Sequence, residues 1–299
     1  MVHRQDTVHA VEASPAMLRS VHADAYLRAL ETSPLKVAQV TELSPLAALP
    51  ACLLRRRVLA PMKFMAGGTL AAGALALERG WAVKLGGGMH HAHFDDGGGW
   101  CAYDDISLLI TQLRAASEGR IRRFLVVDLD VHQGNGHARS KLHRRDADTF
   151  IVDVYNRDIY PRDEAAAAAV DVGVGLPSAT GDVAYLEAVR AALREAFRRC
   201  QPPPDMVVYN AGTDILAGDP LGLLAVSAAG VVARDEAVFA AALEARVPIV
   251  MLPSGGYTAG STPCIAASIG NLVGRFRLTA GAAGARGEAA NAAGAAAGG

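Results

Sequence analysis

The chain has 299 residues, of which 51% are hydrophobic, so it can bury the core of one large α/β domain or of two small domains. Its 29 basic and 30 acidic residues give a net charge of −1, and no basic run longer than the three arginines at 55–57 stands out, which argues against a nucleic-acid-binding surface. The four cysteines lie far apart, without the spacing of a zinc knuckle or of a disulfide framework.

The N-terminal ten residues are polar and lack the apolar core of a signal peptide. No uninterrupted apolar run reaches the roughly 18 residues that a membrane span requires. We therefore expect a soluble, intracellular protein without a membrane span.

From about Ala66 onward, helical patterns alternate with short apolar runs, which is typical of a mostly parallel sheet with helices on both faces. The predicted helices, several of them preceded by a capping Ser, Thr or Asp, are 16–30, 69–79, 105–116, 183–199, 228–244 and 262–272. The predicted strands, each followed by a glycine-rich or polar loop, are 81–85, 124–128, 149–152, 206–210 and 248–252. The fold class is therefore predicted to be α/β.

No internal repeat and no inter-domain linker is visible, so we expect a single catalytic domain over residues 1–278. Residues 279–299 are almost entirely alanine and glycine and bury too little apolar surface to offset their ordering entropy, which predicts a disordered tail. The alanine run 165–169 is either a helical turn or filler in a surface loop.

Four predicted strands end in clusters of reactive side chains, at the edge of a parallel sheet where ligands bind. A glycine run and the pair His90 and His91 follow the strand at 81–85. Asp128, Asp130 and His132 end the next strand, and residues two apart in an extended segment share one face. These three side chains can therefore converge on one point.

The later strands supply a further carboxylate, Asp214, and a phenol, Tyr257. Each cluster alone has an ordinary explanation, because paired histidines are often surface or core residues and acidic loops are common caps and turns. Their joint occurrence at the ends of four strands favours a catalytic site.

At this point the sequence resembles the zinc-dependent histone deacetylases. The similar blocks run in order from about Ser14 to Leu272, and they read GGGMHHAHFDDGGGWCAYDDI, DLDVHQGNGHAR, IVDVYNRDIYPRD, VVYNAGTDILAGDPLG and PSGGYT. The third block, the Gln-Gly-Asn-Gly segment and the Ser-Gly-Gly-Tyr turn resemble the class IV branch in particular.

The resemblance implies an arginase/deacetylase-like fold and one Zn²⁺ per chain, with Asp130, His132 and Asp214 as ligands and open positions for water and substrate. His90 and His91 resemble the paired histidines that handle protons. In the implied mechanism the zinc polarises the amide carbonyl while His91 takes a proton from the attacking water.

The resemblance also implies roles for residues around the ligands. Asp128 resembles the carboxylate behind His90, and Tyr257 the phenol that hydrogen-bonds the substrate oxygen. Asn135 stands where other classes carry an aspartate behind the second histidine, so His91 should be less basic than in those classes. A K⁺ site near Asp128 is a further expectation, with Asp153 as a contributor.

Gly99, Trp100 and Tyr160 resemble the opening and the aromatic walls of the substrate channel, although ordinary core packing is the alternative for each aromatic. The implied substrates are acylated lysine side chains of histones or other proteins, with acetyl or longer fatty acyl groups. The implied biology is chromatin regulation in the nucleus or deacylation in the cytoplasm or an organelle.

Two rival functions remain at this level. An inactive acyl-lysine-binding protein would share the pocket without cleaving the amide, and the family's N-terminal strand region has no counterpart here, which could impair catalysis. An arginase-like ureohydrolase shares the architecture, but its second set of metal ligands is not evident and the Tyr257 turn favours a deacylase.

Overall fold

The structure is a computed structural model that describes residue 7 and residues 9–278. The alanine- and glycine-rich tail predicted at 279–299 lies outside the described residues. One parallel sheet organises the described part of the chain, with the strand order β1-β6-β5-β2-β3-β4. Its strands are β1 (Trp81–Val83), β2 (Phe124–Asp128), β3 (Thr149–Asn156), β4 (Val172–Leu176), β5 (Met206–Asn210) and β6 (Ile249–Leu252).

The central strands are nearly continuous runs of valine, leucine and isoleucine, as expected for strands that are covered on both faces. Every residue of β2 and β5 is buried. Successive side chains along these strands enter two separate core clusters, one on each face of the sheet. Burial on both faces therefore fixes the position of these strands.

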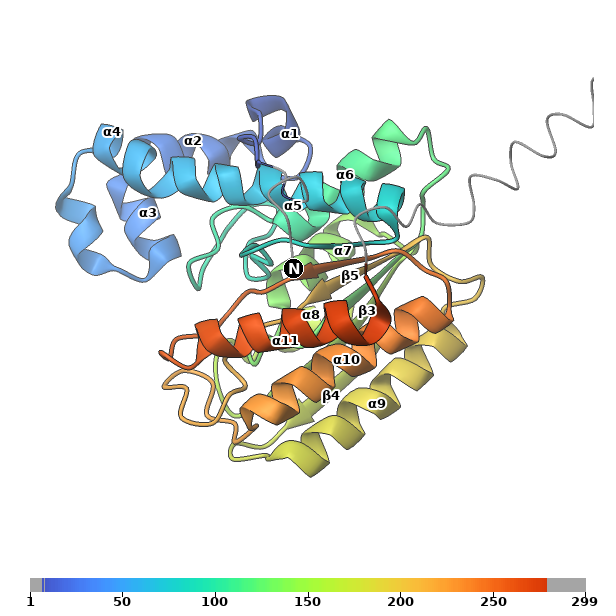
Figure 1. Ribbon diagram of the computed structural model, residues 1–299. Helices are drawn as coiled ribbons and strands as arrows, with labels where there is room; N and C mark the ends of the chain where they lie inside the picture. The colour runs from blue at the N-terminus through green and yellow to red at the C-terminus, as the bar shows by residue number, and fades with distance from the viewer. Residues whose placement is uncertain (1–6, 8, 279–299) are drawn as a thin grey trace, which may run out of the picture.

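Helices cover both faces of the sheet, as the α/β prediction requires (Figure 1). On one face lie α5 (Ala60–Arg79), α6 (Asp105–Ala116), α7 (Asn135–Arg144) and α8 (Glu164–Ala167). On the other face lie α9 (Asp182–Arg199), α10 (Ala228–Glu244) and α11 (Ser261–Phe276).

The register of the sheet brings polar residues together at one edge. Asp128, the last residue of β2, lies opposite Asp153 of β3 and Asn210 of β5. Because all the strands are parallel, the loops that follow β1, β2, β5 and β6 emerge beside one another. The fold therefore gathers the candidate site residues at this edge.

The predicted helix 16–30 is wrong as one element, because the chain forms α1 (Pro15–Arg19) and α2 (Asp24–Thr32). Between them, the backbone N–H of Ala23 donates to the carbonyl of Phe94 at 2.8 Å. The His22 ring bridges the carbonyl of His93 and the backbone N–H of Asp104. These long-range hydrogen bonds hold the segment out of helical geometry.

The predicted helix 69–79 is much longer in the structure, because α4 (Ala51–Leu54), a π-helical turn (Arg55–Leu59) and α5 follow one another. Pro61 has no N–H to donate to the preceding turn, and it lies just after the π-helical turn, where the regular helical hydrogen-bond pattern is already interrupted. Within the described residues, Ala51–Arg79 is the one helical stretch long and apolar enough to cross a membrane, by length and composition alone. Its most apolar window is 39% buried, and one such helix is weak evidence for a span.

Several elements of the described chain were not predicted from the sequence. Two glycines interrupt β4, and α7 is strongly polar and begins at an asparagine and a glycine. The segment α3 (Pro34–Thr41) precedes a 3₁₀ turn over Ser44–Ala48, where no helix was expected. Of the alanine run 165–169, the first residues belong to α8, so the helical-turn alternative holds there.

Candidate metal centre and active site

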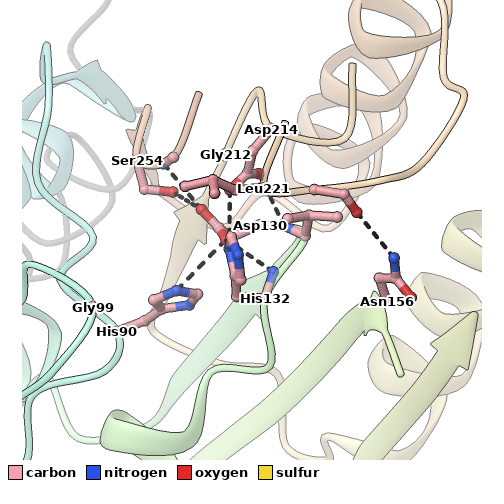
Figure 2. A network of polar contacts seen from close by, with 12 residues as sticks. His90, Gly99, Asp130, His132, Asn156, Gly212, Asp214, Leu221 and Ser254 are labelled. Atoms are coloured by element: carbon pink, nitrogen blue, oxygen red, sulfur yellow. Dashed lines mark hydrogen bonds and ion pairs between the residues drawn. The ribbon is translucent and has the colours of Figure 1, made fainter. Parts of the chain in front are cut away.

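Asp130, His132 and Asp214 meet at the edge of the sheet (Figure 2). Asp130 and His132 come from the loop after β2, and Asp214 comes from the loop after β5. All three are buried, and one ligand atom from each lies within 4.8 Å of the others. The structure thus brings the three predicted ligands together, and they can hold a metal ion.

Hydrogen bonds orient both carboxylates. Asp130 Oδ2 accepts from the Ser254 hydroxyl at 2.8 Å and from the Gly255 N–H at 2.9 Å. Asp214 Oδ1 accepts from the Val131 N–H at 3.0 Å, while the buried Asp214 Oδ2 has no hydrogen-bond partner. Asp214 is therefore held by one oxygen and presents the other to the cluster, while Asp130 Oδ1 also accepts from the His132 N–H at 3.0 Å.

The electrostatics of the cluster fit a divalent cation. His132 Nδ1 lies 3.1 Å from Asp130 Oδ1 and 3.2 Å from Asp214 Oδ2. Burial, followed by repulsion from Asp130, raises the pKa of Asp214 to about 7. A cation bound among these atoms would remove that repulsion, and one imidazole with two carboxylates is a donor set that suits Zn²⁺, Fe²⁺ or Mn²⁺.

His90 shares a buried carboxylate with a second histidine. Its Nδ1 lies 2.9 Å from Asp128 Oδ2, and His137 Nε2 lies 2.9 Å from the same oxygen. Burial disfavours the charged form of His90, but Asp128 and Asp130 outweigh that effect and raise its pKa to about 9. His137 was not predicted as a site residue, because it points inward only once α7 has formed.

His91 lies against His90, with ring centroids 4.1 Å apart, but its partner is an amide. His91 Nδ1 lies 2.7 Å from Asn135 Oδ1. Burial and then the neighbouring His90 lower the pKa of His91 well below its usual value. The two histidines therefore have different electrostatic surroundings, as the asparagine at 135 led us to expect.

The glycine run before the histidines is held by Asp105, a buried residue in the first turn of α6 that the sequence analysis missed. Its carboxylate accepts from the N–H groups of Gly88 at 2.9 Å and Met89 at 2.7 Å. Gly88 has a φ of 70°, and a Cβ there would lie 1.9 Å from Asn210 Oδ1, so only glycine fits.

Tyr257 lies beside the cluster on the loop after β6, and its side chain is half-exposed. Its ring centroid is 6.5 Å from that of His132. The Tyr257 N–H donates to Asp219 Oδ2 at 2.8 Å, and the other oxygen of this buried carboxylate accepts from Leu221 and Gly222. Asp219 thus ties the tyrosine turn to the Asp214 loop, a role that the sequence analysis did not predict.

Two of the three predicted channel residues, Gly99 and Tyr160, lie against His91, and the third, Trp100, is exposed. Tyr160 is 47% exposed and its ring centroid is 5.1 Å from that of His91, so it is not an ordinary core residue. Trp100 is 48% exposed and follows Gly99 directly. A Cβ at Gly99 would lie 2.4 Å from His91 Cδ2. The absence of a side chain at Gly99 therefore leaves room for the histidine.

Asp153 lies next to Asp128 in the sheet and is fully buried. Its Oδ2 accepts from the Gly134 N–H at 3.0 Å, and its Oδ1 has no hydrogen-bond partner. Burial and then the charge of Asp128 raise the pKa of Asp153 well above its usual value. A monovalent cation beside these two carboxylates would satisfy the unpaired oxygen.

A parallel α/β sheet with a buried Asp-His-Asp cluster beside a histidine pair defines an amidohydrolase of the deacetylase type. The chain belongs to the histone deacetylase family, because residues 1–272 match the histone deacetylase domain. The family membership supports deacetylase-type hydrolysis as the reaction class.

The comparisons with curated proteins agree with the family. The chain is 46% identical to histone deacetylase 2 of Arabidopsis thaliana over 265 residues, which are 89% of this chain and 67% of that protein. It is 30% identical to the acetylpolyamine amidohydrolase of Burkholderia pseudomallei over 56% of this chain and 48% of that protein. It is 27% identical to histone deacetylase 8 of Xenopus laevis over 59% of this chain and 53% of that protein. The chain thus spans about half to two thirds of the length of these relatives.

Proposed function

We propose that this protein is a zinc-dependent deacylase that hydrolyses the amide bond of N6-acyl-lysine side chains in proteins, as a class IV member of the family. The observation that carries the proposal is the meeting of Asp130, His132 and Asp214 beside His91, with Tyr257 on the adjoining turn. The family membership supports the hydrolytic chemistry, and the half-exposed Tyr160 and Trp100 support a channel for an acylated side chain.

The protein's own residues divide the proton transfers. When bound, Zn²⁺ supplies a Lewis acid that polarises the substrate carbonyl. Asn135 carries no charge, so His91 is suited to accept the proton of the attacking water. The Asp128 carboxylate stabilises a protonated His90, which is suited to deliver a proton to the departing lysine amine. The Tyr257 hydroxyl donates to the oxygen on which negative charge develops.

We expect Tyr257→Phe to lower kcat about 10² to 10³-fold, because one donor to the developing oxyanion is lost. The Tyr257 N–H donates to Asp219, so the backbone of the turn keeps its anchor in the variant. The measurement is mass spectrometry of acetyl-lysine and myristoyl-lysine peptides after incubation with the zinc-loaded protein. Comparison of the two peptides also gives the preferred chain length.

An N-acetylated polyamine is the third substrate in this assay, because one relative is an acetylpolyamine amidohydrolase. Cleavage of the polyamine alone would overturn the protein-lysine proposal while leaving deacetylase chemistry in place. A folded, zinc-loaded protein that binds an acyl-lysine peptide and cleaves none of the substrates would favour the inactive binding protein. The ureohydrolase alternative is not retained, because the chain belongs to the histone deacetylase family.

Gly99→Ala is expected to lower kcat at least tenfold, because the new methyl group would lie 2.4 Å from His91 Cδ2 and displace the ring. The residue has a φ of 52°, so the substitution also costs about 1–2 kcal/mol of stability. The matched control is Gly119→Ala, since Gly119 has a φ of 81° with nothing within 4 Å of the added Cβ. Equal kcat losses in both variants would argue against a specific contact with His91.

Further parts of the proposal concern cations and location. We place K⁺ beside Asp128 and Asp153, supported by the unpaired buried oxygen of Asp153. Residues 1–278 as the catalytic unit, a location in the nucleus, the cytoplasm or an organelle, and a role in chromatin regulation all stay predictions.

A further inference from the structure

Asp163 lies behind the histidine pair, at the end of the loop that carries Tyr160. Its Oδ2 accepts from Asn135 Nδ2 at 3.3 Å and from Arg139 Nε, and its Oδ1 accepts from Arg139 at 2.9 Å. The Asp163 side chain is 10% exposed. His91 therefore has no carboxylate as its direct partner, but the Asp163 carboxylate lies on the other side of the Asn135 amide.

This arrangement fixes which way the Asn135 amide points. A carboxylate only accepts hydrogen bonds, so the NH₂ group of Asn135 must face Asp163. The amide oxygen then faces His91, where it can only accept from Nδ1. Nδ1 of His91 therefore carries the hydrogen, and Nε2 is left with the free lone pair that a general base needs.

We propose that Asp163 is a positioning residue that sets the tautomer of His91 through the Asn135 amide. The inference rests on the proposed function for the role of His91 as a base, but the hydrogen-bond chain itself is independent of turnover. Asp163 fixes the orientation of the Asn135 amide, and the amide oxygen keeps the hydrogen on His91 Nδ1. The unprotonated Nε2 of His91 then accepts the proton from water.

The main chain at Asp163 is held separately from its carboxylate. The Gln133 side chain donates to the Asp163 carbonyl at 2.9 Å and accepts from the Asp163 N–H at 2.7 Å. Oδ1 also caps α8 by accepting from the Ala166 N–H at 3.0 Å, and asparagine caps helices as well as aspartate does. Asp163→Asn therefore keeps the α8 cap and the main-chain bonds to Gln133, while the atom that faces Asn135 becomes a donor and the ion pair with Arg139 is lost.

In Asp163→Asn, the new NH₂ group faces Asn135 and favours a flipped amide, with its oxygen toward position 163 and its NH₂ toward His91. His91 Nδ1 must then accept, and its hydrogen moves to Nε2. We expect kcat on the acyl-lysine peptide to fall about 10²-fold, with KM changed less than about threefold. Glu164→Gln, an exposed neighbour outside this chain of bonds, is the control and keeps the wild-type kcat.

The double variant Asn135→Asp with Asp163→Asn tests the mechanism directly. The carboxylate introduced at 135 accepts from both His91 Nδ1 and the amide at 163, so the original tautomer returns. We expect kcat within about tenfold of wild type. A purely structural role of Asp163 predicts no such rescue, so failure of the double variant to recover activity would overturn the proposal.

The second readout is NMR of protein with ¹⁵N-labelled histidine, zinc-loaded, with the His91 signals assigned by their loss in His91→Gln. Wild type should show the hydrogen on Nδ1, and Asp163→Asn should show it on Nε2. The same tautomer in both proteins would overturn the inference even if the enzyme is active. If wild type turns over no substrate but the hydrogen still moves from Nδ1 to Nε2 in Asp163→Asn, the proposed function is wrong and the positioning role of Asp163 stands.

Discussion

Chelation of the bound metal is expected to lower hydrolysis of the acyl-lysine peptide at least about 10³-fold, and one equivalent of Zn²⁺ should restore it. The loss follows because Lewis-acid polarisation of the carbonyl lowers the barrier by several kcal/mol, and each 1.36 kcal/mol is a factor of ten in rate. The measurement is the rate of peptide deacylation against zinc content per chain. Full activity in protein shown to be free of metal would contradict the assignment of Asp130, His132 and Asp214 as ligands.

The melting temperature supplies an independent check on the same cluster. Asp214→Asn keeps an oxygen that can accept from the Val131 N–H and removes one of two mutually repelling buried carboxylates. We expect the metal-free variant to melt above the metal-free wild type at pH 8, where the Asp214 carboxyl is largely charged. Added Zn²⁺ should raise the melting temperature of the variant less than that of wild type, because binding to the folded state is weaker. A larger zinc effect in the variant would argue against Asp214 as a ligand.

The parts of the fold that were predicted most accurately are those whose position depends on a local pattern of apolar residues. Strands β2 and β5 match their predicted bounds, because a continuous buried apolar run has one placement in a parallel sheet. The convergence of Asp130 and His132 also follows from local geometry, because residues two apart in an extended segment share a face. Asp128, which was predicted to meet the same point, instead bonds to His90 and His137 behind the cluster.

The parts that were missed depend on contacts between distant segments. Asp105 meets Gly88 across 17 positions, Asp219 meets Tyr257 across 38, and Asp163 meets Asn135 across 28. In the sequence, an aspartate that bonds to a distant segment looks the same as an aspartate that caps a helix. Asp163 does cap α8, and Asp105 follows the cap of α6. The break between α1 and α2 has the same origin, in hydrogen bonds from residues 22 and 23 to residues 93, 94 and 104.

Arg234→Met is expected to destabilise the protein by about 3–5 kcal/mol, because it leaves a buried carboxylate without its cation. Arg234 is fully buried in α10, and its Nε donates to Asp235 Oδ1 at 2.8 Å. The guanidinium also donates to the carbonyls of Leu129 and Gly212, which precede the ligands Asp130 and Asp214 in their loops. Arg234 therefore links both ligand-bearing loops through hydrogen bonds. The measurement is the free energy of unfolding in urea of the zinc-loaded protein.

Two further variants separate the charge from the packing at this position. In Arg234→Met with Asp235→Asn, no buried charge remains at this pair. The amide oxygen at 235 can accept from the Tyr209 hydroxyl, and the amide NH₂ can donate to the Ser268 oxygen, so we expect a smaller loss than in the single variant. Arg198→Met removes an arginine from an exposed pair with Glu195 and should leave the urea midpoint nearly unchanged. If the double variant is no more stable than Arg234→Met, the destabilisation comes from the lost hydrogen bonds to the Leu129 and Gly212 carbonyls and not from the unpaired charge of Asp235. In that case zinc affinity should fall in both variants alike, because the ligand loops have lost their shared anchor.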